Sequence, residues 1–227
     1  MNNLQIDYIY NTDKNDVRVI LINCENKDEL EKINELLKTD CNDYILVGLS
    51  GYDWNKDLSP WKAKAVFKNG EDFSGEGNKY LSYITNTVIP QIKNTINDKQ
   101  LNIEYYAIAG YSLAGLFALY TIYNTDVFSK AVSASGSLWF DGFIDYAREN
   151  KISNNIKTIY LSLGDKEAKT KNPIMASVYD KSIEYYELYK DKLNCYFELN
   201  EGNHFKDVEM RMAKGIKYIL NNWCCFD

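Results

Sequence analysis

Residues 105–120 read YYAIAGYSLAGLFALY, and this stretch decides the fold. Its first five residues form an apolar run typical of a buried strand, and residues 116–120 have the apolar character of a helix. Between them, Ser112 lies two residues after Gly110 and two residues before Ala114. Small residues at those positions allow a sharp strand-to-helix turn that exposes a nucleophilic serine. The alternative interpretation is a serine that only caps the following helix.

Outward from this stretch, segments with strand and helix patterns alternate along the chain. Such alternation predicts an α/β protein whose mainly parallel sheet is covered by helices on both faces. Pro90 lies within one helical pattern, and we expect it to kink that helix. No repeat, linker or low-complexity segment divides the chain, so we expect one domain over residues 1–227. The predicted strands are 17–22, 44–49, 105–109, 131–135, 156–163 and 194–199, and the predicted helices lie near 29–37, 80–92, 116–120, 183–188 and 208–223.

The overall charge and hydropathy exclude several classes of function. The chain has 227 residues, a formal net charge of −6 and no long basic run, so it lacks the electrostatic footprint of a nucleic-acid-binding protein. No segment approaches the ~20 apolar residues of a membrane span, and the first residues lack the pattern of a secretion signal. We therefore expect a soluble cytoplasmic protein that binds neither membranes nor nucleic acids. Composition gives no indication of the oligomeric state.

The five cysteines form an odd set without the spacing of zinc ligands or of redox pairs. A vicinal disulfide between the adjacent Cys224 and Cys225 would be strained, so reduced thiols are expected throughout. With a single histidine in the chain, a zinc site is not expected either. The sequence thus predicts no metal and no cofactor. The cysteines are Cys24, Cys41, Cys195, Cys224 and Cys225.

His204 is the only histidine, and it follows the last predicted strand. A serine hydroxyl needs a base within hydrogen-bonding reach, and the order serine, acid, histidine is that of a hydrolase with this architecture. We therefore expect His204 to serve Ser112 as its base, although a lone histidine elsewhere is usually structural. The backbone N–H of Leu113, at the start of the next helix, is expected to stabilise an oxyanion.

The acid that orients the histidine should come from the loop that follows the predicted strand 156–163. That loop contains Asp165 and Glu167, and either carboxylate could accept a hydrogen bond from the imidazole. We favour Glu167, because it lies three residues past Gly164 and can curl back toward the histidine. Asp165 is the alternative acid. Lys166 between them also fits a loop of ordinary surface charges.

A second oxyanion donor is expected in the turn after the predicted strand 44–49. Glycine lets a backbone N–H approach a substrate oxygen, so Gly51 or Tyr52 could supply the donor, although an ordinary turn fits as well. Aromatic residues in polar loops could line a substrate cleft or pack in the core. The loop 70–76 is expected near the mouth of the site. The expected substrate-binding residues are Trp54, Trp139 and Tyr111.

Five segments in this order resemble the Putative esterase family of α/β-hydrolases, which includes trilactone siderophore esterases and esterase D-like proteins. They are Asp57-Leu58-Ser59-Pro60-Trp61, Gly110-Tyr111-Ser112-Leu113-Ala114-Gly115-Leu116, Ser135-Gly136-Ser137-Leu138-Trp139, Leu163-Gly164-Asp165-Lys166-Glu167 and Gly202-Asn203-His204-Phe205. The resemblance covers residues 44–223. It implies an α/β-hydrolase fold, a three-layer sandwich with a mainly parallel central sheet. It also implies Ser112 as nucleophile, His204 as base and Glu167 as the favoured acid.

The chain departs from the family pattern in two places. Asn55-Lys56 stands where the family commonly has an arginine, which weakens the expectation of an anionic substrate. The N-terminal region is short, and we expect little room there for extra strands.

The sequence as a whole predicts a serine carboxylic-ester hydrolase that acts on a small ester, of siderophore type or another kind. The alternatives are an acyltransferase or thioesterase with the same site, or a non-catalytic binding protein on a hydrolase scaffold.

Overall fold

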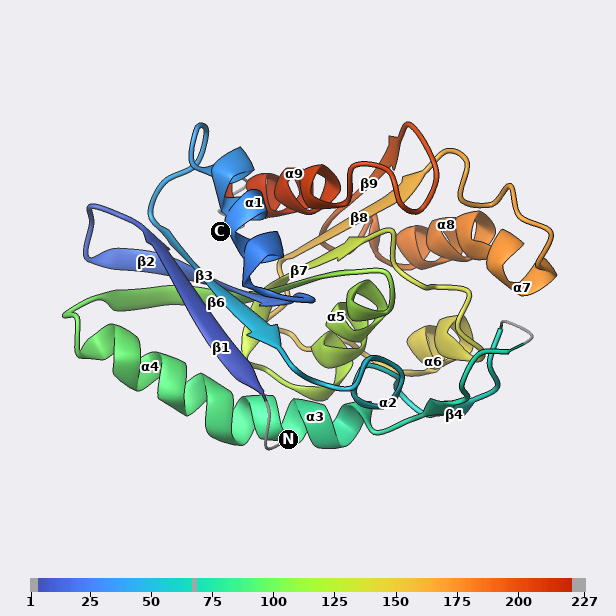
Figure 1. Cartoon of the computed structure of the whole chain (residues 1–227), viewed down its shortest axis with the longest axis horizontal. Coiled ribbons are helices and arrows are strands. Elements are labelled where there is room, and N and C mark those ends of the chain that lie inside the picture. The colour runs from blue at the N-terminus through green and yellow to red at the C-terminus, as the bar shows by residue number, and fades with distance from the viewer. Residues whose placement is uncertain (1–3, 67–68, 222–227) are drawn as a thin grey trace.

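The computed structural model describes residues 4–66 and 69–221, and a seven-stranded sheet forms the centre of this part of the chain (Figure 1). The strand order is β1-β3-β2-β6-β7-β8-β9, and neighbouring strands are parallel except for β1, which pairs antiparallel with β3. The expected mainly parallel sheet is therefore confirmed. The strands are β1 (Gln5–Asn11), β2 (Asp16–Asn23), β3 (Tyr44–Ser50), β6 (Asn102–Tyr111), β7 (Phe128–Ala134), β8 (Thr158–Gly164) and β9 (Asn194–Asn200).

Helices cover both faces of the sheet, which gives three layers (Figure 1). One face packs against α1 (Lys27–Leu37) and α9 (Val208–Asn221), which also contact each other. The remaining long helices lie on the other face. They are α3 (Gly77–Tyr83), α4 (Ile89–Asn97), α5 (Leu113–Asn124), α6 (Phe143–Glu149) and α8 (Val178–Tyr189). Shorter elements are α2 (Trp54–Asp57), α7 (Pro173–Ala176) and the hairpin of β4 (Lys62–Ala63) and β5 (Phe73–Ser74).

Strand β2 shows why continuous apolar runs form the centre of this sheet. Val19 and Leu21 are fully buried among the residues that face α4 and α5, whereas Ile20 and Ile22 are fully buried on the side of α1 and α9. Successive side chains of a strand point to opposite faces, so a strand covered on both faces needs apolar residues at every position. The same requirement explains why β3 is buried along its whole length.

Just before Pro90, where the sequence predicts a kink, the structure has a π-helical turn, η1 (Ile84–Val88), between α3 and α4. The N–H of Ile89 donates to the carbonyl of Ile84, five residues earlier, and Pro90 occupies the first turn of α4. Proline has no N–H to donate, so a wider turn directly before it lets the helical path continue.

The expectation of little room for N-terminal strands is wrong, because β1 lies at one edge of the sheet. An edge strand has one hydrogen-bonded neighbour and is only partly buried, so β1 lacks the continuous apolar run that identifies the inner strands. The predicted helix 208–223 corresponds to α9, which is described as far as Asn221. Residues 222 and 223, Cys224 and Cys225 lie outside the described residues. The cysteines of the described part, Cys24, Cys41 and Cys195, are free thiols.

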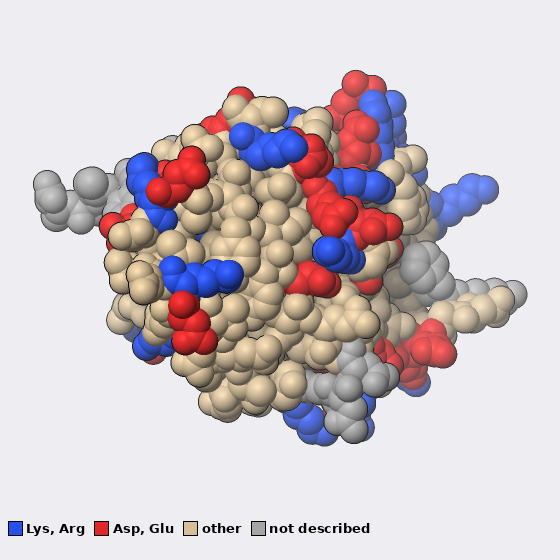
Figure 2. Space-filling view, turned by 60° about the vertical axis from the view of Figure 1, so that its left-hand side comes forward, with Lys and Arg blue, Asp and Glu red and all other residues tan. Residues whose placement is uncertain are grey.

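Charged groups of both signs lie next to one another on the surface, as the face in Figure 2 shows. An example is the ion pair of Lys217 with Asp40, which joins α9 to the end of α1 at 2.6 Å. Exposed pairs of this kind contribute at most about 1 kcal/mol each to stability. Within residues 4–66 and 69–221, no helix is long and apolar enough to cross a bilayer. The same residues contain no group of three or more His, Cys, Asp or Glu side chains placed to hold a metal ion.

Candidate active site

Ser112 lies at the sharp turn between β6 and α5, in a backbone conformation that is unusual for a serine. Its φ is 55° and its ψ is −121°, which a residue with a Cβ adopts only when the surrounding structure enforces it. Gly110 makes this tight turn possible, because a Cβ at residue 110 would lie 2.2 Å from the carbonyl oxygen of Ala114. The chain can therefore turn back this closely only with glycine at residue 110.

The structure brings Ser112, His204 and Glu167 into one hydrogen-bonded chain. His204 Nε2 lies 3.0 Å from Ser112 Oγ, and His204 Nδ1 lies 2.7 Å from Glu167 Oε2. The three side chains come from the loops after β6, β9 and β8, although 92 residues separate the serine from the histidine. A neutral imidazole with its proton on Nδ1 donates to the carboxylate and accepts the serine proton at Nε2.

Glu167 is held on both of its carboxylate oxygens. Its side chain is 4% exposed, and Oε1 accepts hydrogen bonds from Ser135 Oγ at 2.7 Å and from the Gly164 N–H at 2.7 Å. Burial by itself raises the pKa of Glu167, but the hydrogen bonds from His204, Ser135 and Gly164 outweigh burial and lower the pKa below its ordinary value of 4.5. The group is therefore a carboxylate at neutral pH.

Asp165, the alternative acid, does not contact the imidazole. Its Oδ1 accepts a hydrogen bond from the backbone N–H of Gly202 at 2.6 Å, and this bond is the main cause of its lowered pKa. Gly202 lies two residues before His204, so Asp165 fixes the loop that carries the histidine. Of the two acids that the sequence left open, the structure places Glu167 on the imidazole.

Arg211 on α9 is a member of this network that the sequence interpretation missed. Its side chain is 1% exposed, and Nη1 donates to Glu167 Oε1 at 2.8 Å and to Ser135 Oγ at 2.9 Å. Nη2 donates to the carbonyls of Asn203 at 2.9 Å and of Glu201 at 3.2 Å. One guanidinium thus ties the acid to the histidine loop. The sequence does hold a signal for Arg211: it lies in the apolar part of the helical pattern, beside Met212 and close to Ile216, which are also buried.

A cavity of about 760 Å³ opens over Ser112 and His204. Trp54, Trp139 and Tyr111, the expected substrate-binding residues, are among those that line this cavity. The Tyr111 hydroxyl is already engaged, because it donates to the carbonyl of His204 at 2.7 Å and accepts from Arg211 at 3.2 Å. The cavity is also bounded by Leu113, Ser137, Gly70, Glu71 and Phe73, which places part of the loop 70–76 beside the site. Ser137 Oγ lies 3.4 Å from Ser112 Oγ.

Gly51 and Tyr52, the expected second oxyanion donors, are not among the residues that line this cavity. The Tyr52 hydroxyl instead donates to the carbonyl of Cys24 at 3.2 Å, and its ring packs 5.6 Å from that of Tyr80. In the sheet, β2 and not β3 pairs with β6. The loop after β2 reaches the cavity, where Asn23, Glu25 and Asn26 line it.

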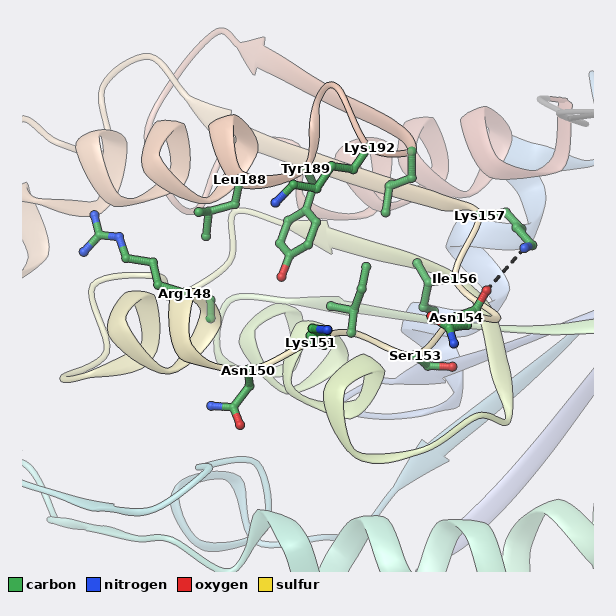
Figure 3. Close-up of a pocket in the computed structure, with 13 residues that line it drawn as sticks. Arg148, Asn150, Lys151, Ser153, Asn154, Ile156, Lys157, Leu188, Tyr189 and Lys192 are labelled. Atoms are coloured by element: carbon green, nitrogen blue, oxygen red, sulfur yellow. Dashed lines mark hydrogen bonds between the residues drawn. The ribbon is translucent and has the colours of Figure 1, made fainter.

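A second cavity, of about 680 Å³, lies between the loop after α6 and the end of α8 (Figure 3). None of its lining residues belongs to the site predicted from the sequence. Its charged lining residues are all cations, namely Arg148, Lys151, Lys157 and Lys192. The hydrogen-bonded chain of Ser112 is therefore associated with the first cavity, not with this one.

Comparisons with known proteins agree with the fold. The family model described as "Putative esterase" matches residues 19–203. Uncharacterized protein YbbA of Bacillus subtilis is 27% identical over 149 residues, which are 65% of this chain and 59% of that relative, so the match spans less than two thirds of its length.

Solved structures with the same fold include two siderophore hydrolases of Aspergillus nidulans, EstA and EstB. Each superimposes with a TM-score of 0.73, at 16% and 19% identity, over 96% and 97% of this chain and 90% of their own chains. The IroE-like serine hydrolase of Shewanella oneidensis has a TM-score of 0.72 at 16% identity, over 93% of this chain and 70% of its own. At these identities the likeness shows a shared fold.

Proposed function

The chain belongs to the Putative esterase family, and from this premise we propose that it is a serine carboxylic-ester hydrolase that acts through an acyl-enzyme on Ser112. The observation that carries the proposal is the hydrogen-bonded chain from Ser112 Oγ through the imidazole of His204 to Glu167, with distances of 3.0 and 2.7 Å. These distances are within the reach that proton transfer from a nucleophile to its base requires.

In the proposed reaction, the Ser112 hydroxyl attacks the ester carbonyl while His204 Nε2 accepts its proton. Glu167 holds the Nδ1–H of the imidazole and stabilises the positive charge that forms on the ring. Leu113 is the first residue of α5 and lines the cavity, so its backbone N–H is the proposed donor to the oxyanion. His204 then gives its proton to the leaving alkoxide, and water repeats the sequence on the acyl-enzyme.

The substrate is proposed to be a small ester, because the cavity of about 760 Å³ lies in the size range of small-molecule sites. EstA and EstB are named as siderophore hydrolases, so a siderophore-type ester is one substrate to test. A family model that names esterases and a cavity beside the serine both support the ester class.

The proposal is tested by replacing the two groups that exchange the proton. Ser112→Ala and His204→Ala should each lower kcat/KM for 4-nitrophenyl butyrate by roughly 10³-fold or more, while the circular dichroism spectrum and Tm stay those of a folded protein. Turnover near the wild-type rate in either variant would contradict the mechanism.

Covalent labelling identifies the nucleophile independently of turnover. A fluorophosphonate should modify the wild-type protein and the Ser137→Ala variant, and it should leave Ser112→Ala unmodified. Ser137 is the matched control, because its hydroxyl lies 3.4 Å from that of Ser112 in the same cavity. Labelling that is lost only in Ser137→Ala would reassign the nucleophile.

A further inference from the structure

The charged residues that line the cavity over Ser112 are almost all acidic. Among the described residues of this lining, and apart from Glu167 and His204, which bind each other, Lys32 is the one basic side chain, and its Nζ donates to Glu209 at 3.1 Å. Among the described lining residues, acidic side chains therefore outnumber basic ones in the cavity that contains the proposed nucleophile. The remaining acidic lining residues are Glu25, Asp28, Glu29, Glu71 and Glu209.

Three of these carboxylates lie close enough to act on one another. Burial is the main cause that raises the pKa of Glu29, and the charges of Glu25 and Glu209 raise it further. The hydrogen bond from the Glu25 N–H to Glu29 Oε2, at 2.7 Å, and the charge of Lys32 lower it, but less. Glu25, Glu29 and Glu209 thus form an acidic wall of the cavity around the start of α1 and the start of α9.

Aromatic rings line the same cavity. Trp54 and Trp139 line it, and the ring centroid of Phe73 lies 6.2 Å from that of Trp139. Phe205 is 84% exposed, and its ring lies 5.3 Å from that of His204. Aromatic faces attract cations through the negative charge of their π-systems, and alkylammonium groups are commonly bound between such faces.

The acidic lining is not a simple consequence of the net charge of −6. Among the described residues, the second cavity, in Figure 3, is lined by four cations and by no carboxylate. Two cavities of similar volume on one chain thus carry opposite charge. The acidic and aromatic character belongs to the cavity that contains Ser112.

We propose that the ester hydrolysed at Ser112 carries a positive charge, of the alkylammonium class, in its acyl or alcohol part. Carboxylates around the cavity raise the local concentration of such an ester, and aromatic faces bind its cationic group. Anionic esters are repelled by the same charges, and uncharged esters lie between the two. This inference rests on the proposed function, because it assigns the substrate class of that same site.

The test compares three 4-nitrophenyl esters that differ only in the end of the acyl chain. They carry trimethylammonium, tert-butyl or sulfonate at the same position, in the 4-(trimethylammonio)butanoate, the 5,5-dimethylhexanoate and the 4-sulfobutanoate. At low ionic strength, kcat/KM should follow the order cation, neutral, anion. The kcat/KM of the cationic ester should exceed that of the anionic ester by at least about tenfold. Added salt should reduce this ratio, because salt screens exposed charges.

A pair of matched variants locates the source of the preference. Glu25→Gln combined with Glu71→Gln removes two exposed carboxylates of the lining and should lower the cation-to-anion ratio several-fold. Glu104→Gln combined with Glu149→Gln removes the same charge from exposed positions outside the cavity and should leave the ratio unchanged.

Each outcome decides one of the two claims. The cationic substrate class would be overturned by equal kcat/KM for the three esters, by a preference for the sulfonate, or by an equal effect of the two double variants. In each of these cases, hydrolysis of the neutral ester would still support the proposed esterase activity. Absence of turnover with all three esters would contradict the proposed function itself, and the substrate class would fail with it.

Discussion

Glu167 and Asp165 are two residues apart, yet their carboxylates accept hydrogen bonds from different partners. Glu167 Oε2 accepts from the imidazole of His204, whereas Asp165 Oδ1 accepts from the backbone of Gly202. Glu167→Gln should therefore lower kcat by roughly 10²-fold or more, because an amide neither stabilises the imidazolium nor fixes the required tautomer.

Asp165→Asn is the matched control for this substitution. It should lower kcat less than tenfold, since an amide oxygen can still accept the Gly202 N–H. Ester hydrolysis by the two variants at neutral pH makes the comparison. A larger loss in Asp165→Asn than in Glu167→Gln would assign the acid to Asp165.

A substitution at Gly110 tests whether the turn around Ser112 requires a residue without a side chain. A Cβ there would lie 2.2 Å from the carbonyl oxygen of Ala114, and backbone cannot move aside as a flexible side chain can. Gly110→Ala should cost more than about 3 kcal/mol of unfolding free energy or prevent folding, as overpacking does at a rigid contact.

Gly142→Ala separates this steric effect from backbone strain. The φ of Gly142 is +75°, but a Cβ there meets no atom closer than 3.6 Å, so its cost should stay near about 1 kcal/mol. Urea unfolding of both variants provides the comparison. A Gly110→Ala variant as stable as Gly142→Ala would show that the turn can relax.

At the scale of elements, the site depends on four neighbouring strands that run the same way. Parallel strands end at one edge of a sheet, and β6, β7, β8 and β9 are consecutive in it. Their following loops therefore bring Ser112, Ser135, Glu167 and His204 together at that edge. The sequence predicts the inner strands but not their order, so it does not reveal that β2 lies next to β6 and that the loop after β2 lines the cavity.

Helix α9 contributes Arg211, whose guanidinium joins the loops after β8 and β9. Arg211→Met leaves Glu167 buried without its ion-pair partner, and removing one partner of a buried pair costs about 3–5 kcal/mol. We expect a loss of this size in unfolding free energy, together with lower kcat because the acid and the histidine loop lose their common support.

Lys214→Met, on the same helix, is the control for Arg211. Lys214 is 44% exposed, and it pairs with Glu198 at 2.7 Å on the surface, so its replacement should cost at most about 1 kcal/mol. Urea unfolding and ester hydrolysis should be measured on both variants. Equal losses in the two would show that Arg211 does not support the site.

At the scale of the whole molecule, Glu167 makes stability depend on pH. Its pKa in the folded protein is below the ordinary value of 4.5. The unfolded chain therefore binds this proton more readily, so the stabilisation is complete above about pH 4.5 and is lost as pH falls through the lower folded value.

Glu167→Gln isolates this contribution to acid stability. We expect the wild type to lose unfolding free energy more steeply than Glu167→Gln as the pH falls from about 5 to about 3. Urea midpoints across that range measure the two slopes. Parallel slopes would show that Glu167 is not a source of acid sensitivity.

The sequence by itself determined the parts of this protein that local patterns encode. Continuous apolar runs identify the inner strands, and small residues around Ser112 identify the strand-to-helix turn. A single histidine after the last predicted strand limits the choice of base to His204. Each of these features is visible within a few residues, because side-chain periodicity and turn sterics act over that distance.

Only the tertiary structure decided which groups meet across the chain. It places Glu167, and not Asp165, in hydrogen-bonding contact with His204, and it brings Arg211, 44 residues further along the chain, to the same carboxylate. It also places the loop after β2, and not Gly51, in the lining of the cavity. Carboxylates and aromatic rings from distant parts of the chain also line one cavity. The physical reason is that strand order and long-range packing follow from contacts between distant segments, which no local pattern specifies.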